Sequence, residues 1–194
     1  MIALSQQRLH VTSSKHCRRT YLTQDHIALA LTGKSVPDLS LQATDGNEID
    51  LARLEGTTVL YAFPRTSPPN EPPIEGWDQI PGARGCTPQS RGFAEHHDAI
   101  LLAGARRVFG LSTQDTDYQK EVVERLSLPF SILSDEQLAF ADALELPRFE
   151  AGGMTLLSRI TLVIEDGRVR KVFSPVENPA ENAAEVAAFL RSRC

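Results

Sequence analysis

The chain has 194 residues, of which 41% are apolar and 23% charged, so it has the composition of a globular domain and is not a disordered chain. The formal net charge of −5 argues against a protein that binds nucleic acid. No apolar run approaches the roughly 20 residues that a membrane-spanning helix requires, so we expect no part in a membrane. Three cysteines are too few for a disulfide framework, and free thiols favour a reducing compartment.

Residues 1–34 form a basic segment, with five Lys and Arg against one acid. The segment lacks the apolar stretch of a signal peptide. It is compatible with a transit-like leader, a DNA-contacting arm or an extension from an upstream start codon, and we favour a poorly ordered tail without a catalytic role. We therefore expect one folded domain over residues 35–194, located in the cytoplasm.

The first predicted elements precede a long loop. Leucines alternate with polar residues on either side of Asp45-Gly46, which predicts a β-hairpin over residues 39–51. The run TVLYAF at 58–63 is typical of a strand buried on both faces. Residues 64–85 then contain six prolines and three glycines, which predicts a loop without regular structure. Loops of this length in compact domains are usually functional or disordered.

Helices and strands alternate after the loop. Pro88 suits the first position of a helix, and the apolar spacing predicts that this helix continues to near Gly104, with His97 packed on its apolar face. Further helices are predicted at 118–126, 138–144 and 183–190, strands at 108–111 and 130–133, and a second hairpin over 160–173. This order predicts an α/β fold with a central mixed sheet, helices on both faces and an antiparallel edge.

One cysteine occupies a position where a thiol can be reactive. Cys86 follows Gly85 at the entrance to the first long helix, where unpaired amides and the positive end of the helix dipole favour a thiolate. The glycine also removes side-chain bulk where a small substrate would approach. The alternative is an inert buried cysteine, and the position alone leaves both interpretations open.

Five segments carry a pattern that covers most of the chain: VLYAFP at 59–64, GCTPQS at 85–90, VFGLS at 108–112, LPFSILSD at 128–135 and RITLVIEDG at 159–167. With these segments in this order, from about Val36 to Leu190, the core resembles a peroxiredoxin. It is most similar to the bacterioferritin-comigratory or Q-type branch of the alkyl hydroperoxide reductase/thiol-specific antioxidant superfamily. The resemblance implies a thioredoxin-like fold and a peroxidase that uses a cysteine and no metal or bound organic cofactor.

The resemblance also assigns roles to three residues. Cys86 matches the peroxidatic cysteine, whose thiolate attacks a peroxide oxygen and becomes a sulfenic acid. Arg159 matches the arginine that stabilises the thiolate and the charge developing on the peroxide, and Pro64 matches the proline that shields the thiolate. The implied substrates are hydrogen peroxide and small organic hydroperoxides, with electrons from thioredoxin, glutaredoxin or a small thiol. A homodimer is one possible assembly, and the sequence leaves the oligomeric state open.

The loop before Cys86 departs from the family pattern. That pattern places a hydroxyl residue three positions before the cysteine and a proline seven before it, whereas this chain has Ala83 at the first position and Pro64 lies 22 residues back. An insertion of about fifteen residues, which carries Trp77, explains the longer spacing. Thr66 or Ser67 is the candidate for the missing hydroxyl, and we expect Trp77 to pin the loop onto the domain.

A second departure concerns how oxidised Cys86 is reduced. Q-type members often carry a resolving cysteine five residues after the first, and Arg91 stands at that position. The alternatives are Cys194, Cys17, a second subunit or an external thiol, of which we favour the external thiol. Rival interpretations are a redox sensor that passes its oxidation to a partner and a degenerate relative that retains the fold as a binding protein.

Overall fold

The computed structural model describes residues 24–72 and 74–193, so Cys17 and Cys194 lie outside the described part. Its strands are β1 Ser40–Ala43, β2 Glu48–Asp50, β3 Thr57–Ala62, β4 Ala105–Ser112, β5 Ile132–Ser134, β6 Arg148–Ala151, β7 Met154–Leu157, β8 Ile160–Glu165 and β9 Arg168–Phe173. Its α-helices are α1 Gln24–Leu31, α2 Cys86–Glu95, α3 His97–Leu102, α4 Thr116–Leu126, α5 Ala139–Leu144 and α6 Asn182–Arg191. Two short 3-10 helices are η1 Leu51–Arg53 and η2 Trp77–Gln79.

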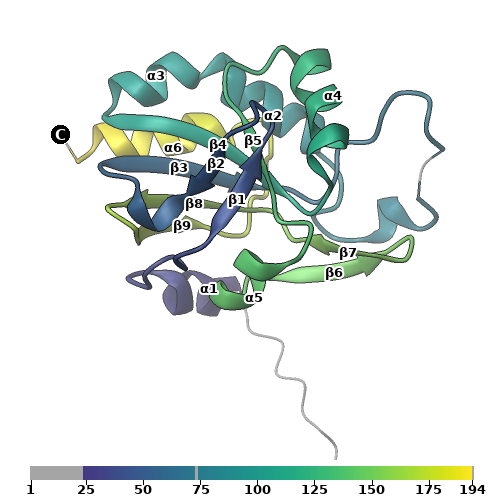
Figure 1. Ribbon diagram of the computed structural model, residues 1–194, viewed down its shortest axis with the longest axis horizontal. Coiled ribbons are helices and arrows are strands. Elements are labelled where there is room, and N and C mark those ends of the chain that lie inside the picture. The colour runs from purple at the N-terminus through teal and green to yellow at the C-terminus, as the bar shows by residue number, and fades with distance from the viewer. Residues whose placement is uncertain (1–23, 73, 194) are drawn as a thin grey trace, which may run out of the picture.

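Seven strands form one mixed sheet in the order β2-β1-β5-β4-β3-β8-β9 (Figure 1). In its centre β3 and β5 run parallel to β4, and the β8–β9 hairpin adds the predicted antiparallel edge. At the carboxyl end of β3, Ala62 lies between Leu111 of β4 and Ile160 of β8. Pro64, which follows β3, and Arg159, which precedes β8, therefore lie at the same end of these two neighbouring strands.

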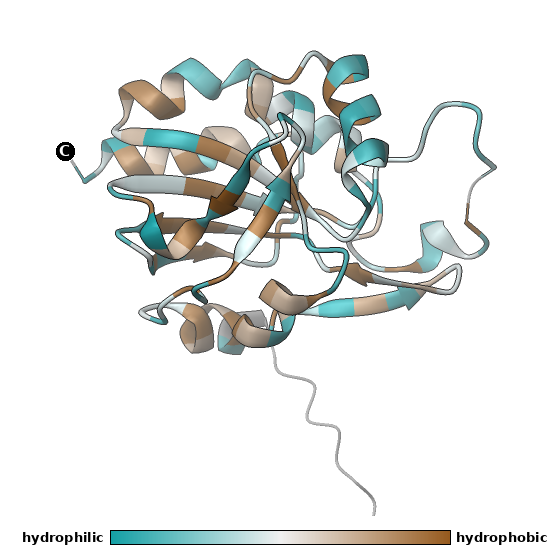
Figure 2. Cartoon of the chain, viewed as in Figure 1, coloured by the Kyte–Doolittle hydropathy of each residue, from teal (hydrophilic) through white to brown (hydrophobic). Residues whose placement is uncertain are grey.

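Helices cover both faces of this sheet, as the apolar pattern predicts (Figure 1). On one face the strands pack with α2, α3, α4 and α6, and on the other with α1 and α5. Alternate residues of β3 point to opposite faces: Val59 and Tyr61 belong to the first core, and Leu60 and Ala62 to the second. Figure 2 shows apolar colour on the central strands and on parts of the helices.

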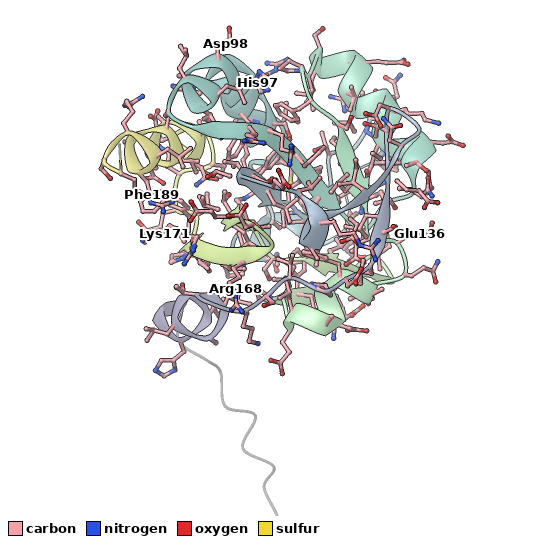
Figure 3. All side chains as sticks on the ribbon, turned by 60° about the vertical axis from the view of Figure 1, so that its left-hand side comes forward. His97, Asp98, Glu136, Arg168, Lys171 and Phe189 are labelled. Carbon is pink, nitrogen blue, oxygen red and sulfur yellow. The ribbon has the colours of Figure 1, made fainter. Side chains whose placement is uncertain are left out.

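The structure confirms both predicted hairpins but corrects the helix that follows the long loop. Its first turn begins at Cys86 and not at Pro88, which occupies the third position of α2. The predicted continuous helix is also divided, because His96 caps the end of α2 and α3 starts at His97. The side chain of His97 packs against the Phe130 ring at 5.8 Å, as expected, and Figure 3 shows it beside Asp98 at the start of α3.

The boundary between tail and domain differs from the prediction at residue 34. Residues 24–31 form α1, and Leu31 is buried in the core. The Gly33 amide donates a hydrogen bond to the Val169 carbonyl at 2.8 Å, and Lys34 forms a salt bridge with Glu145. The ordered domain therefore includes at least the last eleven residues of the basic segment, and residues 1–23 lie outside the described part.

A short hairpin that the sequence analysis did not predict precedes β8. Strands β6 and β7 pair only with each other, through Phe149 opposite Leu156, and turn at Gly152 and Gly153. The loop that follows β3 extends toward this hairpin, as Figure 1 shows. The predicted loop over residues 64–85 is confirmed, except that η2 forms one short turn of helix within it. Among the described residues of the loop, η2 is the one regular element.

Candidate active site

Cys86 is the first residue of α2 and is 5% exposed. Gly85 caps the helix with a φ of 103°, a backbone conformation that residues with a side chain rarely adopt. The thiol group of Cys86 donates a weak hydrogen bond to the Ala83 carbonyl, with the sulfur 3.6 Å from the oxygen. The prediction that this cysteine sits at a helix start is confirmed, and there the free amides of the first turn favour negative charge.

Two glycines bring α2 against the segment that leads into α6. A Cβ atom on Gly85 would lie 2.6 Å from Cγ of Pro179, and one on Gly92 would lie 2.7 Å from the Ala180 carbonyl oxygen. Real Cβ atoms do not approach other atoms this closely, so both positions require glycine. This close packing fixes the start of α2, and with it the sulfur of Cys86, relative to α6.

The side chain of Arg159 reaches this sulfur from the entrance of β8. Its Nη2 atom lies 3.3 Å from Sγ of Cys86, and the guanidinium is buried with the residue 5% exposed. Nη2 also donates to the carbonyls of Gly82, Ala83 and Arg84 at 3.2, 3.4 and 2.8 Å. Two residues that are 73 positions apart in the sequence are thus in direct contact, as the resemblance implies.

The surroundings of Arg159 leave its positive charge for the thiol. In the described part of the chain its partners are main-chain carbonyls, one side-chain amide and Cys86, and none of them is a carboxylate. A buried charge without a counter-ion is costly, and an adjacent thiolate would neutralise it. The contact therefore places an uncompensated positive charge next to the sulfur atom.

An aromatic floor lies beneath the first turns of α2. The ring of Tyr61 stacks on Phe93 with centroids 4.3 Å apart, and its hydroxyl group donates to Ser90 Oγ at 3.2 Å. Burial raises the pKa of Tyr61 far above its ordinary value, so this phenol remains neutral. The floor holds α2 on the sheet by packing and does not supply a charge to the site.

Pro64, the third predicted residue, is buried at the point where the chain leaves β3. Its carbonyl accepts hydrogen bonds from the Ser112 hydroxyl at 3.1 Å and from Gln114 Nε2 at 3.3 Å. These bonds hold Pro64 at the carboxyl end of β3, next to the start of β8 where Arg159 lies. Its role as a shield of the thiolate stays a prediction.

The two candidates for the missing hydroxyl differ. Thr66 is 2% exposed, and its Oγ1 atom has no partner in the described residues. Ser67 is exposed and accepts a hydrogen bond from Nη1 of Arg65 at 2.9 Å. No hydrogen bond of either hydroxyl to Cys86 occurs in the described residues, so which of them replaces the missing hydroxyl stays a prediction.

A cavity of about 680 Å³ opens beside the site. Gly85 and Arg159 line it, together with Gly82, Pro147 and Pro179. The residues that flank the sulfur, Gly85 and Arg159, thus line the cavity, whereas Cys86 itself is not among its lining residues. The cavity is therefore the candidate entrance for molecules that react with the cysteine.

The middle of the inserted loop is attached to the domain through Trp77, whereas its last residues contact Arg159 and Cys86. The rings of Trp77 and Phe149 of β6 are 6.1 Å apart, which confirms that Trp77 pins the loop onto the domain. Arg84 forms a salt bridge with Asp78, and Arg65 forms another with Glu71. Figure 2 colours most of this loop hydrophilic, in keeping with a segment that lies on the surface.

Other predicted features lie apart from Cys86 or outside the description. Arg91 is exposed, and Cys17 and Cys194 are not in the described residues, so their part in resolution stays a prediction. No group of three or more His, Cys, Asp or Glu that could hold a metal ion occurs in residues 24–72 and 74–193. In the same ranges no helix is long and apolar enough to cross a membrane.

The family model described as Redoxin matches residues 31–189. The chain belongs to the redoxin family. Its match begins within α1 and ends within α6, so it includes β3, Cys86 and Arg159. This match extends the similarity to almost the whole described domain.

Curated redoxin relatives are peroxiredoxins of the Q type, as the resemblance predicted. The chain is 29% identical over 162 residues to "Peroxiredoxin Q, chloroplastic" of Oryza sativa subsp. japonica, which covers 82% of this chain and 66% of that protein. It is 26% identical over 185 residues to the protein of the same name from Sedum lineare, covering 94% and 90%. The chain thus spans just under two thirds of the length of the first of these relatives.

Solved structures confirm the thioredoxin-like peroxiredoxin fold. Peroxidoxin BcpB from Mycobacterium tuberculosis superposes with a TM-score of 0.67 at 24% identity, covering 84% of this chain and 97% of that one. Peroxiredoxin Q from Xanthomonas campestris superposes with a TM-score of 0.65 at 21% identity, covering 86% and 98%. At these identities the likeness concerns the fold.

Sequence reasoning found Cys86 from its local position and Arg159 only through the resemblance. It missed Gln89 and Asn182, which the structure places behind the guanidinium. A signal for Gln89 was present, because residues three apart share one face of a helix and Gln89 follows Cys86 by three. No local signal pointed to Asn182, which lies 93 positions from Gln89.

Proposed function

We propose that this redoxin is a thiol-dependent peroxidase in which Cys86 is the nucleophile and Arg159 its electrostatic partner. The observation that carries the proposal is the 3.3 Å contact between Nη2 of Arg159 and Sγ of Cys86. A buried guanidinium without a carboxylate partner stabilises a thiolate, and it can also stabilise negative charge on a departing oxygen. The similarity to Q-type peroxiredoxins supports the same chemistry.

In the proposed first step the thiolate of Cys86 attacks one oxygen of the peroxide. The S–O bond forms as the O–O bond breaks, and the second oxygen leaves with the electron pair and takes up a proton as water or an alcohol. The cysteine is oxidised to a sulfenic acid and the peroxide is reduced. Hydrogen peroxide and small organic hydroperoxides are the proposed substrates, because the thiol is only 5% exposed and Gly85 next to it carries no side chain.

In the second step an external thiol attacks the sulfenic sulfur, which gives a mixed disulfide and water. A second thiol then releases Cys86 and leaves as a disulfide. Arg91 at the usual resolving position supports this one-cysteine cycle, and the cavity of about 680 Å³ offers room for a small thiol or the exposed cysteine of a redoxin partner. Thioredoxin, glutaredoxin and small thiols are the proposed reductants, in the cytoplasm.

The test adds one equivalent of hydrogen peroxide to the reduced full-length protein and measures its intact mass without reductant. We expect a gain of one oxygen within seconds, because the sulfenic acid has no partner cysteine on its helix. The Cys86→Ser variant, treated in the same way, should keep its mass. Added small thiol should then return the wild-type mass to its starting value.

Other outcomes separate the rival interpretations. Loss of two hydrogens would show that Cys17 or Cys194 resolves the sulfenic acid, and the Cys17→Ser and Cys194→Ser variants would identify which one. A rapid gain of oxygen that small thiols reverse only slowly would favour a redox sensor. No change in mass would overturn the proposal and favour a protein that retains the fold for binding.

A further inference from the structure

The cavity beside Cys86 is much larger than hydrogen peroxide requires. Its volume is about 680 Å³. A water molecule occupies about 30 Å³ in the liquid, and hydrogen peroxide is little larger. Gly85 and Arg159 form part of the cavity wall, and Nη2 of Arg159 is 3.3 Å from Sγ of Cys86. A peroxide that reacts with this sulfur would therefore lie beside the cavity, which leaves room for a group attached to its second oxygen.

The inserted loop builds one side of this cavity. Residues 78–82 and Arg84 of the loop line it, and the side chain of Ile80 is half-buried there. Two further aliphatic side chains come from separate segments, Ile27 from α1 and Val176 from the chain before α6. Four prolines complete the apolar part of the lining: Pro81, Pro147, Pro175 and Pro179. Such a lining stabilises a bound hydrocarbon group, because it removes the surface of that group from water.

Four charged residues line the cavity, and they do not balance when Cys86 is ionised. Nε and Nη2 of Arg84 contact the two carboxylate oxygens of Asp78 at 2.5 and 2.8 Å, so these two charges compensate each other. The charge of Arg159 is compensated by a thiolate at Cys86, 3.3 Å away. Glu177 is exposed and forms no salt bridge with any described residue. The lining therefore retains one negative charge, which repels an anionic group and does not affect an uncharged one in this way.

We propose that the cavity holds the organic group of a hydroperoxide and that Glu177 makes it select uncharged groups over anionic ones. The inference rests on the proposed function, because it concerns the peroxide that Cys86 reduces. The thiolate attacks the terminal oxygen, the S–O bond forms as the O–O bond breaks, and the sulfenic acid keeps the hydroxyl proton. The second oxygen leaves with the electron pair and its organic group, as an alkoxide that takes up a proton from water. The favoured substrates are uncharged aryl or branched alkyl hydroperoxides, and the disfavoured ones carry a carboxylate.

The test compares cumene hydroperoxide with its para-carboxylate, and hydrogen peroxide is the reference without an organic group. Competition kinetics gives the second-order rate constant of the full-length protein with each peroxide. Each constant is divided by that of the same peroxide with a free small thiol, which removes intrinsic differences in reactivity. We expect a normalised preference for cumene hydroperoxide over its carboxylate of about threefold to tenfold at low ionic strength, and added salt should reduce it.

Glu177→Gln tests the selection by charge, because it keeps the size of the side chain and removes the carboxylate. The preference should fall about threefold, while the constant with hydrogen peroxide stays at the wild-type value. Glu124→Gln is the matched control, since Glu124 is exposed on α4 and does not line the cavity. An unchanged preference in Glu177→Gln would overturn the selection by charge. An equal fall in Glu124→Gln would assign the preference to the net charge of the protein, which also contradicts the proposal.

Ile80→Ser tests where the organic group lies. The constant with cumene hydroperoxide should fall about fivefold, because apolar contact is lost, and the constant with hydrogen peroxide should not change. Ile74→Ser is the matched control, since Ile74 is half-buried in the same loop, near Gly152, and does not line the cavity. No fall in Ile80→Ser would overturn the placement of the organic group. Equal falls for both peroxides, or in both isoleucine variants, would assign the effect to a disturbed loop and would overturn it as well.

Hydrogen peroxide separates this inference from the proposed function. If the wild type reacts with none of the three peroxides, the proposed function fails, and the inference fails with it. If the wild type reacts with hydrogen peroxide but the variants of Glu177 and Ile80 keep its selectivity, Cys86 reduces peroxides without using the cavity, and the inference alone is wrong. A preference that depends on both residues, with an unchanged constant for hydrogen peroxide, is the result expected.

Discussion

Asp135 and Arg159 are the two buried side chains of the Asp, Glu, Lys and Arg type in the described part of the chain, and each lies beside the start of a helix. Asp135 is 1% exposed, and its two carboxylate oxygens accept from the amides of Phe140 and Ala141 in α5 at 2.9 and 2.8 Å. Each oxygen therefore has its own main-chain donor, and the charge caps a helix.

Arg159 is bound differently at the start of α2. Its partners include the thiol of Cys86, and its Nε atom has no partner in the described residues. A buried charge with complete main-chain partners is a structural element, whereas a buried charge that faces a nucleophile can stabilise a reaction. The comparison teaches that the partners of a buried charge, and not its burial, indicate function.

The largest expected effect is that of Arg159→Lys. An ammonium group cannot hold Gln89 and the loop carbonyls while it also reaches Sγ, because it lacks the planar fork of the guanidinium. We expect the second-order rate constant with hydrogen peroxide to fall about a hundredfold, as when one donor is removed from a site that stabilises developing charge. Competition kinetics against a reference peroxidase measures it.

The thermal midpoint of Arg159→Lys, measured in the same buffer, is the control for folding. A folded variant whose rate constant stays within about threefold of the wild type would mean that Arg159, like Asp135, has a structural role. The contrast between the two buried charges would then be wrong.

Gly85→Ala tests whether the start of α2 must be held in place. The φ of 103° and the approach of Pro179 to 2.6 Å both oppose a side chain, so we expect a loss of about 2 kcal/mol in the free energy of unfolding. The displaced Cys86 should react with peroxide about tenfold more slowly, since misplacement of a reacting group is costly. Denaturant titration and stopped-flow kinetics measure the two effects.

Gly76→Ala is its matched control. Gly76 also has a positive φ, of 72°, but a Cβ atom there would meet nothing within 4 Å. This variant should lose only about 1 kcal/mol and react at the wild-type rate, because Gly76 lies in the loop away from the sulfur. Equal losses of rate in the two variants would show that backbone strain, and not the contact with Pro179, is responsible.

Asp135→Asn should affect stability and not reactivity. An asparagine has one acceptor oxygen where two amides of α5 need partners, so we expect the free energy of unfolding at pH 7 to fall by about 1 kcal/mol. The rate constant with peroxide should stay at the wild-type value, because the carboxylate contacts only α5. A fall of that rate constant would connect Asp135 to the site and remove the contrast with Arg159.

The same variant gives a dependence on pH whose sign is fixed. Burial raises the pKa of Asp135 in the folded protein above its ordinary value of 3.8. At a pH between 3.8 and this raised pKa, the folded state therefore binds more protons than the unfolded chain. Stability therefore increases as the pH falls from neutral through this range. The difference in free energy of unfolding between wild type and Asp135→Asn should be larger at pH 4 than at pH 7, and a smaller difference would contradict the raised pKa.

Much of the sheet could be predicted because its strands are continuous apolar runs or hairpins with Asp-Gly turns. The β6–β7 hairpin could not, because each strand has four residues and alternation over so short a stretch is weak evidence. The division of the predicted helix at His96 was also hidden, since the apolar spacing continues across His96 from α2 into α3.

The site was predictable in its local part only. Gly85 and Pro88 mark the helix start that exposes Cys86 to free amides, and that information is contained in four consecutive residues. Arg159 and Asn182 come from elements far along the chain, and their approach to α2 depends on the order of strands in the sheet. That order could not be deduced from the patterns of a single sequence. Arg159 was therefore found through the resemblance, and Asn182 was missed.

The smallest expected effect is that of Trp77→Ala. The indole ring fixes the inserted loop to Phe149 of β6, whereas the carbonyls of Gly82, Ala83 and Arg84 connect the end of the loop with Arg159. We expect a loss of less than about 1 kcal/mol in the free energy of unfolding, since one aromatic pair is removed, and a rate constant with peroxide within about twofold of the wild type. Stopped-flow fluorescence cannot be used without the tryptophan, so competition kinetics measures the rate. A fall as large as that of Gly85→Ala would mean that the middle of the loop, and not only its last residues, controls access to Cys86, and the insertion would then belong to the site.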